Sequence, residues 1–154
     1  MRGTPETWAK LPPLKNALAT IAAELDACVH RAVHAGVDRR RIVIDPGLGF
    51  GKRKEQNSEI LGRLEELARL ELPILAGPSR KHFLARESAA ETEFASAAAV
   101  AAAVFFGAHL VRVHDVKSMK AVVEVADEIA KARAEAVSSA VGTAGSSGFR
   151  AGPR

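Results

Sequence analysis

Three groups of glycine and polar residues have the composition of ligand-binding loops. The first, Asp45–Lys52, begins with a carboxylate and contains three glycines, which let a backbone approach a flat or anionic ligand closely. The second, Gly77–Lys81, places a hydroxyl beside two cations, which suits a carboxylate, a phosphate or a carbonyl oxygen. In the third, Arg112–Asp115, an extended backbone would direct Arg112 and His114 to the same side, where two cationic groups suit a pyrophosphate.

Each group also has an ordinary structural interpretation. Asp45 stands before a Pro-Gly pair and could simply begin a turn. Ser79 could cap a helix and leave Arg80 and Lys81 in solvent. His114 taken alone could be structural. The recurrence of such groups directly after successive predicted strands favours the functional interpretation.

The elements that must position these groups follow from hydrophobic periodicity. Apolar residues at steps of three and four predict four helices, over about 14–33, 57–70, 92–106 and 116–136. Short apolar runs between them predict three strands, at 41–44, 73–76 and 109–113. Strands that alternate with helices indicate an α/β fold, in which a parallel sheet is covered by outer helices. Loops that follow such strands converge on one rim, where α/β folds bind ligands.

The spacing of the strands narrows the fold class. The predicted strand ends, at Asp45, Gly77 and Arg112, are 32 and 35 residues apart. A (β/α)8 barrel, or TIM barrel, repeats about every 31 residues. An open doubly wound sheet has similar spacing, so spacing alone does not choose between them. A barrel needs eight strands, and about three parallel strands would make up only its last part. The first would lack a neighbour on one edge, so we expect a marginally stable chain.

Composition and charge limit the classes of protein. With 154 residues, 47% hydrophobic and 26% charged, the chain is typical of one globular domain. We expect that domain over residues 1–137 and a disordered Gly- and Ser-rich tail over 138–154.

The single cysteine, Cys28, excludes an internal disulfide, favours a cytoplasmic location and is predicted to lie in the core. Apolar runs fall short of the roughly 18 residues of a membrane span, so no membrane partner is expected.

These three groups resemble the motifs of the dihydropteroate synthase family, pterin-binding transferases of folate biosynthesis with a (β/α)8 fold. Ile42–Lys52 looks like the second signature of the family, Gly77–Lys81 like its serine-arginine-lysine motif, and Arg112–Asp115 like its last motif. Met1–Pro5 is similar to the segment after its fifth strand. The resemblance covers about residues 1–131 in order, and it implies the C-terminal portion of a barrel.

The resemblance implies a reaction and roles for the pterin-binding residues. A dihydropterin-methyl group would pass from its pyrophosphate ester, 6-hydroxymethyl-7,8-dihydropterin pyrophosphate, to the amine of para-aminobenzoate, giving dihydropteroate and pyrophosphate. Asp45 and Gly77 would bind substrate, with the Asp45 carboxylate accepting hydrogen bonds from the pterin ring. Lys81, Arg112 and His114 would be catalytic. Lys81 would contact the acceptor edge of the pterin, while Arg112 and His114 would hold the departing pyrophosphate.

The resemblance also implies a second substrate site, a cofactor and partners. Ser79 would bind the carboxylate of para-aminobenzoate, Phe50 would wall its ring, and Arg80 would support the site without touching substrate. A magnesium ion would assist, with ligands expected from the N-terminal half of the barrel. The partners implied are a second copy, through the late helices in a homodimer, or that N-terminal half.

Three other interpretations remain open. A methyltetrahydrofolate-binding methyltransferase domain resembles the same pterin-binding barrel, although Ser79–Lys81 speaks against it. A non-catalytic barrel fragment would act only by association through its apolar helices. The net charge of +4 would suit a nucleic-acid-binding module, but aromatic residues amount to only 5% and do not interleave with the basic clusters, so no nucleic acid partner is expected.

Overall fold

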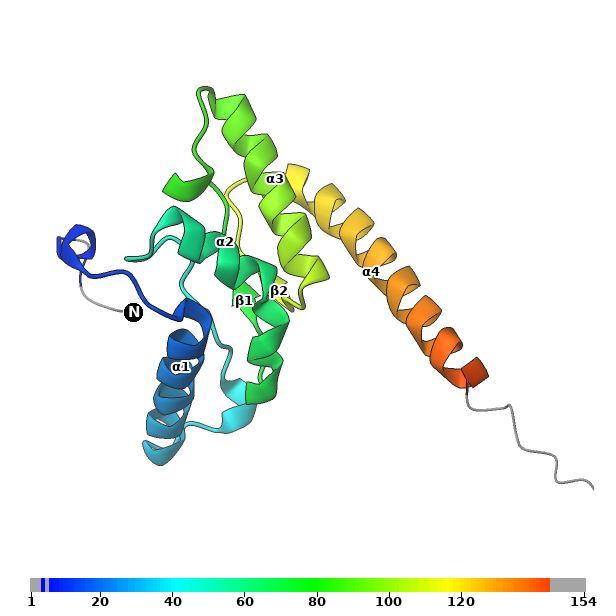
Figure 1. The fold of residues 1–154 in the computed structure, drawn as a ribbon, viewed down its shortest axis with the longest axis horizontal. Helices are drawn as coiled ribbons and strands as arrows, with labels where there is room; N and C mark the ends of the chain where they lie inside the picture. Colours follow the sequence, from blue (N-terminus) through cyan, green and yellow to red (C-terminus); the bar gives the residue numbers. More distant parts are fainter. Residues whose placement is uncertain (1–3, 5, 145–154) are drawn as a thin grey trace, which may run out of the picture.

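The computed structural model describes residue 4 and residues 6–144, and it confirms the alternation of strands and helices in the second half of the chain (Figure 1). Short 3-10 helices are labelled η. In chain order the elements are η1 (Trp8–Lys10), α1 (Ala17–His34), η2 (Arg39–Arg41), α2 (Lys54–Gly62), η3 (Leu64–Leu70), β1 (Leu75–Ala76), η4 (His82–Leu84), α3 (Ala89–Phe105), β2 (Leu110–Val111) and α4 (Val116–Ala144).

Three stretches of backbone run parallel at the centre of the molecule. β1 pairs with β2 in a parallel register that places Leu75 opposite Leu110. On the other side of β1, Ile44 forms a single parallel bridge with Ile74. The three stretches are therefore adjacent in their sequence order, and their carboxyl ends meet at one edge.

The first predicted strand, residues 41–44, is wrong in length. Arg39–Arg41 forms η2 instead, because the Asp38 carboxylate accepts a hydrogen bond from the backbone N–H of Arg40 at 2.9 Å and caps the turn. Only the bridge at Ile44 remains of this strand. The described part of the chain provides no strand on its outer side, and an edge strand gains ladder hydrogen bonds from one neighbour only. Val43 next to the bridge is 47% exposed.

The predicted helix over 57–70 is divided in two. α2 ends at Gly62, and Arg63 leaves the helical conformation with φ −132°. The chain then continues as η3, with Leu64 and Leu67 buried. Glycine is a poor helix former, which explains why the break falls at this point.

Side-chain caps set the beginnings of α1 and α3. Asn16 accepts a hydrogen bond from the N–H of Ala19 at 3.2 Å, so α1 begins at Ala17 rather than near residue 14. Ser88 and Glu91 form a capping box, so α3 begins before the predicted residue 92. Each cap satisfies backbone N–H groups that the first turn of a helix leaves unpaired.

The last helix is longer than the sequence suggests. α4 continues to Ala144, so residues 138–144 are helical. The prediction of a disordered tail is wrong for these residues. Val137, Val141 and Ala144 extend the apolar period of the helix past the serine pair at 138–139. The rest of the predicted tail, residues 145–154, lies outside the described residues.

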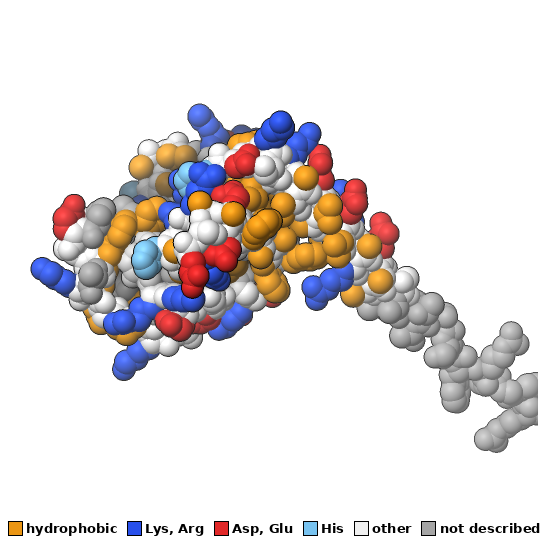
Figure 2. Space-filling model, turned by 90° about the horizontal axis from the view of Figure 1, so that it is seen from above, with side chains coloured by type: hydrophobic (Ala, Val, Ile, Leu, Met, Phe, Trp, Pro, Cys, Tyr) orange, Lys and Arg blue, Asp and Glu red, His pale blue; other side chains and the backbone are white. Residues whose placement is uncertain are grey.

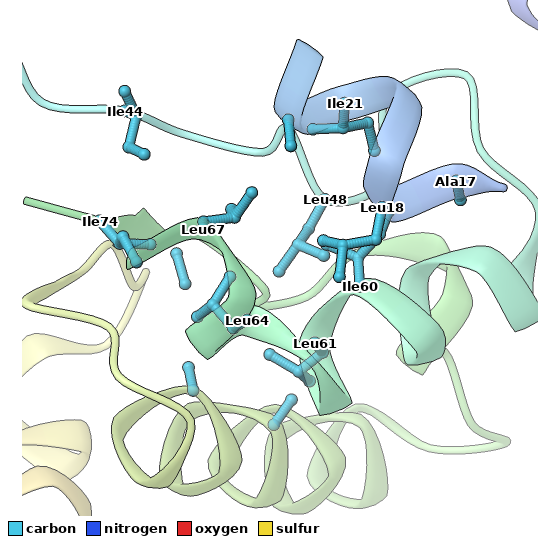
Figure 3. Close-up of a cluster of buried hydrophobic side chains, with 14 of the residues drawn as sticks. Ala17, Leu18, Ile21, Ile44, Leu48, Ile60, Leu61, Leu64, Leu67 and Ile74 are labelled. Carbon is cyan, nitrogen blue, oxygen red and sulfur yellow. The ribbon is translucent and has the colours of Figure 1, made fainter. Parts of the chain in front are cut away.

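The hydrophobic core lies between α1, α2, η3 and the parallel segments. Leu18, Leu48 and Ile60 lie together at its centre, each at most 2% exposed (Figure 3). Ile74 and Leu67 continue the same cluster toward the parallel segments (Figure 3). The core therefore holds the loop after Ile44 and the beginning of β1 against the helices, and with them the rim that carries the polar groups.

Burial differs between α3 and the cysteine of α1. The alanine-rich α3 buries Ser96, Val100 and Ala103 and packs along α4. Between residues 92 and 106, Phe94 and Ala98 are exposed and the other side chains are buried or half-buried, so the helix is covered on most of its sides. Cys28 is exposed on α1, and the prediction of a core position is wrong. Its neighbour Val29 is the residue that α1 buries there.

The far part of α4 projects from the body of the molecule, and hydrophobic side chains are visible along it (Figures 1 and 2). Val125, Ile129 and Val137 are each more than half exposed on this helix. None of the described helices combines the length and the apolar character needed to cross a membrane.

Candidate functional site

The three groups of polar residues lie where the three parallel segments end. Asp45 follows the bridge at Ile44, Gly77 follows β1, and Arg112 follows β2. Because parallel segments end at the same edge, groups far apart in the sequence come together there. The structure thus brings together the residues that the sequence analysis singled out, and their contacts show how.

Arg112 connects the third segment to the first. Its Nη2 lies 3.7 Å from Oδ2 of Asp45, and its guanidinium lies over Gly77. A Cβ built on Gly77 would lie only 3.1 Å from that nitrogen, so the missing side chain makes room for the arginine. The other oxygen of Asp45 accepts a hydrogen bond from the N–H of Gly47 at 2.7 Å. Asp45 therefore both begins a turn and faces the site.

The glycine loop is shaped by backbone conformations that favour glycine. Gly47, Gly49 and Gly51 have φ values of +70°, +80° and +63°. Lys52 closes the loop, with Nζ donating to the carbonyl oxygen of Gly47 at 2.6 Å. The ammonium of Lys52 is thus used to hold the loop together.

Lys81 crosses from the second segment to this loop. Its Nζ lies 3.8 Å from the centroid of the Phe50 ring, a cation–π contact. Its aliphatic chain covers Gly49, where a Cβ would lie 2.8 Å from Cδ of the lysine. Burial lowers the pKa of Lys81, the positive charge of Arg112 lowers it further, and Asp45 opposes both effects. The site therefore disfavours a second charge beside Arg112 and makes the amine easier to deprotonate.

Ser79 and His114 connect the second and third segments. Oγ of Ser79 lies 3.0 Å from Nδ1 of His114, and the backbone N–H of His114 donates to the same oxygen at 3.3 Å. Ser79 is 2% exposed, whereas His114 is exposed. Ser79 does not cap η4, so the capping interpretation is wrong and the hydroxyl belongs to the site.

The residues of the site surround two neighbouring cavities. A cavity of about 310 Å³ is lined by Gly77, Ser79, Lys81, Arg112, Val113 and His114. Asp45 and Phe50 line a second cavity, of about 210 Å³, together with α1. The Arg112–Asp45 and Lys81–Phe50 contacts lie between the two cavities. A larger cavity, of about 740 Å³, opens between Trp8, the glycine loop and His82 and contains none of the seven predicted binding residues.

Two residues of the motifs face away from the cavities. Arg80 forms an ion pair with Glu93 of α3, with Nε 2.8 Å from Oε2. Asp115 caps α4, because its carboxylate accepts hydrogen bonds from the N–H and the hydroxyl of Ser118. The hydrogen bond from the Ser118 side chain lowers the pKa of Asp115, and the backbone hydrogen bond adds to the effect.

The sequence analysis missed the residues that hold the loops. Asn57 is 1% exposed; its Oδ1 accepts from the N–H of Gly49 at 2.7 Å, and its Nδ2 donates to the carbonyl oxygens of residues 52 and 53. Ser96 is fully buried and accepts from the N–H of Arg80. Each precedes apolar core residues of its helix by three and four positions, so this spacing could have shown that both face the core, although not which loop they hold.

Comparison with protein families gives an independent assignment. Residues 1–114 match the family described as pterin binding enzyme. The dihydropteroate synthase of Synechocystis is 38% identical over 133 residues, covering 84% of this chain and 46% of that protein. The Mycobacterium leprae enzyme is 43% identical over 116 residues, covering 70% of this chain and 41% of its own length. The chain thus spans less than half the length of these relatives.

Solved structures agree with this similarity. The dihydropteroate synthase from Xanthomonas albilineans in complex with 7,8-dihydropteroate superposes with a TM-score of 0.73 at 36% identity, covering 77% of this chain and 47% of that one. The enzyme from Thermus thermophilus in complex with 4-aminobenzoate gives a TM-score of 0.74 at 36% identity, covering 81% and 52%. These neighbours are TIM barrels. The described residues of this chain, which are mostly helical and contain two short parallel strands, correspond to part of such a barrel.

Proposed function

Because this chain belongs to the pterin binding enzyme family, among the dihydropteroate synthases, we propose that it supplies the rim on which a dihydropterin pyrophosphate and para-aminobenzoate react. In this reaction the amine nitrogen forms a bond to the methylene carbon attached to the pterin. The bond from that carbon to the pyrophosphate oxygen breaks, pyrophosphate leaves with the electron pair, and the amine releases a proton. The convergence of Asp45, Lys81 and Arg112 on one rim is the observation that carries the proposal.

Asp45 and Lys81 would bind the pterin. One oxygen of Asp45 is engaged by Gly47, while the other lies 3.7 Å from Arg112 and retains lone pairs for the adjacent N–H donors of a pterin. Lys81 would donate to the acceptor edge of the ring. An uncharged pterin edge suits a lysine whose pKa is lowered by burial and by Arg112.

Arg112 and His114 would hold the pyrophosphate. Both line the 310 Å³ cavity, Arg112 is 60% exposed, and the contact of its guanidinium with Asp45 at 3.7 Å is long for an ion pair. The guanidinium therefore keeps donors for phosphate oxygens. Negative charge develops on the pyrophosphate as the C–O bond breaks, and the guanidinium of Arg112 would stabilise it. The absence of a side chain at Gly77 leaves room for the guanidinium at this position.

Ser79 and Phe50 would form the site for para-aminobenzoate. The hydroxyl of Ser79 lies in the 310 Å³ cavity and can turn from His114 to donate to a carboxylate. Phe50 is held by an edge contact with Trp8, with ring centroids 5.3 Å apart, and by Lys81 over its face. The ring of para-aminobenzoate placed against Phe50 would lie close to Lys81, and therefore close to the pterin that Lys81 would bind.

Magnesium is part of the proposed reaction, in which it would neutralise charge on the pyrophosphate. Within residue 4 and residues 6–144, no group of three or more His, Cys, Asp or Glu side chains is arranged to hold a metal ion. The ligands of the ion would therefore come from the other half of the barrel.

Two associations belong to the same proposal. The exposed edge at Ile44 and the exposed Val43 would pair with the remaining strands of a barrel. The exposed apolar side chains Val125, Ile129 and Val137 on α4 would pack against a second copy. Light scattering at high concentration tests the second association, and a monodisperse monomer would contradict it.

The first test is calorimetric titration of the purified chain with an unreactive analogue of dihydropterin pyrophosphate and magnesium. The same titration uses Asp45→Ala and Lys81→Ala, with Lys131→Ala on the exposed side of α4 as the control. We expect binding in the wild-type and control chains and its loss in the two site variants.

The second test concerns turnover. We expect the chain to form dihydropteroate only when the remaining N-terminal half of a related barrel is added, because preorganisation of the site depends on both halves. A folded wild-type chain that binds no analogue, alone or with that half, would refute the proposed function.

A further inference from the structure

Arg80 has a backbone conformation that is unfavourable for a residue with a side chain. It lies between Ser79 and Lys81, whose side chains line the 310 Å³ cavity, and its φ is +52°. Left-handed conformations bring Cβ close to the backbone, so a non-glycine residue stays in one only when its surroundings hold it there. The contacts of Arg80 show what holds it.

Two residues on α3 bind Arg80 from the side away from the cavities. The backbone N–H of Arg80 donates to Oγ of Ser96 at 2.9 Å, and Nε donates to Oε2 of Glu93 at 2.8 Å. Glu93 and Ser96 are three positions apart, so they lie on the same face of the helix. The hydroxyl of Ser96 donates to the carbonyl oxygen of Thr92 at 2.8 Å, which directs a lone pair toward Arg80.

The burial of Glu93 and Ser96 indicates that they hold Arg80 in place. Ser96 is fully buried, and the Glu93 side chain is only 26% exposed. Among the described side chains, Oε1 of Glu93 is a buried polar atom without a hydrogen-bond partner. Leaving a carboxylate oxygen out of water is unfavourable, and the guanidinium of Arg80 is the contact that offsets it here. The Arg80 side chain is 49% exposed, so the guanidinium meets Glu93 on its buried side and solvent on the other.

We propose that Glu93 and Ser96 are positioning residues, which hold Arg80 in its left-handed conformation and thereby direct Ser79 and Lys81 into the site. The backbone turns at Arg80, where the N–H of Lys81 donates to the carbonyl oxygen of Pro78 at 3.2 Å. Ser79 thereby reaches His114 on one side while Lys81 reaches Phe50 on the other. Without that turn the two side chains cannot keep both contacts. The inference rests on the proposed function insofar as Ser79 and Lys81 bind the two substrates.

The test uses the full chain with Glu93→Gln, Glu93→Asp and Ser96→Ala. Glu87→Gln, an exposed acidic position in the loop before α3, is the matched control. The first readout, amide hydrogen exchange at Arg80 measured by NMR without ligand, needs no binding activity. We expect Glu93→Gln and Ser96→Ala to accelerate this exchange by at least about tenfold, with Glu93→Asp in between and Glu87→Gln unchanged.

The second readout is affinity for 4-aminobenzoate and for an unreactive dihydropterin pyrophosphate analogue. We expect Glu93→Gln and Ser96→Ala to weaken both by about tenfold, because small displacements of binding groups are costly, and Glu93→Asp to restore part of the loss. A double variant with Arg80→Gln should show no additional loss from Glu93→Gln, since the two residues act as one unit.

The outcomes separate this inference from the proposed function. Unchanged exchange at Arg80 in both Glu93→Gln and Ser96→Ala would overturn it, whether or not a ligand binds. Faster exchange with unchanged affinities in a chain that binds both ligands would also overturn it, because the contacts would then be only structural. A folded wild-type chain that binds neither ligand, alone or with the N-terminal half of a related barrel, refutes the proposed function, and exchange at Arg80 then decides the positioning by itself.

Discussion

Oδ1 of Asn57, a residue buried in α2, accepts a hydrogen bond from the backbone N–H of Gly49 at 2.7 Å. The amide nitrogen of the same side chain donates to the carbonyl oxygens of residues 52 and 53. One side chain thus holds both the middle and the end of the glycine loop. Lys81 lies against Gly49, so the position of a binding residue depends on a helix residue that faces the core.

Asn57→Ala is expected to lower the free energy of unfolding by about 2–3 kcal/mol, because it leaves the N–H of Gly49 and two carbonyl groups without this partner. Urea denaturation measures the change. Asn16→Ala, the same substitution at the exposed cap of α1, should cost only about 1 kcal/mol. Equal losses in the two variants would contradict the role of Asn57 in holding the loop.

Gly49→Ala is expected to weaken binding of the pterin analogue and to destabilise the chain by at least about 1–2 kcal/mol, the usual cost of a left-handed residue with a Cβ. The new Cβ would meet Cδ of Lys81 at 2.8 Å and push the lysine from Phe50. Gly62→Ala is the control, since a Cβ there meets nothing within 4 Å, and it should stabilise α2 slightly. Unaltered binding in Gly49→Ala would show that Lys81 does not need this contact.

The pKa of Lys81 should respond in opposite directions to its two charged neighbours. Burial and Arg112 lower this pKa, whereas Asp45 raises it, so Arg112→Gln should move it up and Asp45→Asn should move it down. NMR titration of the lysine amine measures both, with Glu128→Gln on α4 as a distant control. A lowered pKa also means that this residue adds stability as pH rises through its folded value toward that of the unfolded chain. Shifts of the same sign in both variants would refute this electrostatic arrangement.

The cap of α4 should make stability depend on pH at the acidic end. Hydrogen bonds from the side chain and backbone of Ser118 lower the pKa of Asp115, so the folded state favours the carboxylate. That stability is present above the ordinary aspartate value, near 3.9, and is lost as pH falls through the lower folded value. Ser118→Ala should therefore be less stable than wild type at pH 7, and the difference should shrink on acidification. Thermal unfolding between neutral and acidic pH checks this, and a difference that stays constant would contradict it.

Much of the site follows from the sequence because parallel strands share a direction. Asp45, Gly77 and Arg112 each come directly after an extended apolar segment, and the carboxyl ends of such segments necessarily meet at one rim. The alternation of strands and helices predicts that rim without any knowledge of distances. The approximate positions of α1, α3 and α4 follow in the same way from apolar residues at steps of three and four.

Short-range hydrogen bonds moved the ends of some predicted helices and strands, because they competed with the hydrophobic periodicity of the sequence. The cap at Asp38 turned residues 39–41 into a 3-10 helix, and the capping box at Ser88 moved the beginning of α3. The first strand shrank to the bridge at Ile44 because strand length depends on a neighbour, which the sequence of the segment itself does not contain.

The sequence by itself therefore determined which residues reach the rim, since that depends on strand direction and on the position of each residue in its segment. Only the tertiary structure decided what holds them there. Asn57, Glu93 and Ser96 are polar residues on helices, and the helical pattern does not show which of them face a loop far away in the chain. Those contacts depend on how helices pack over the parallel segments. The same packing exposes Cys28 and buries its neighbour Val29.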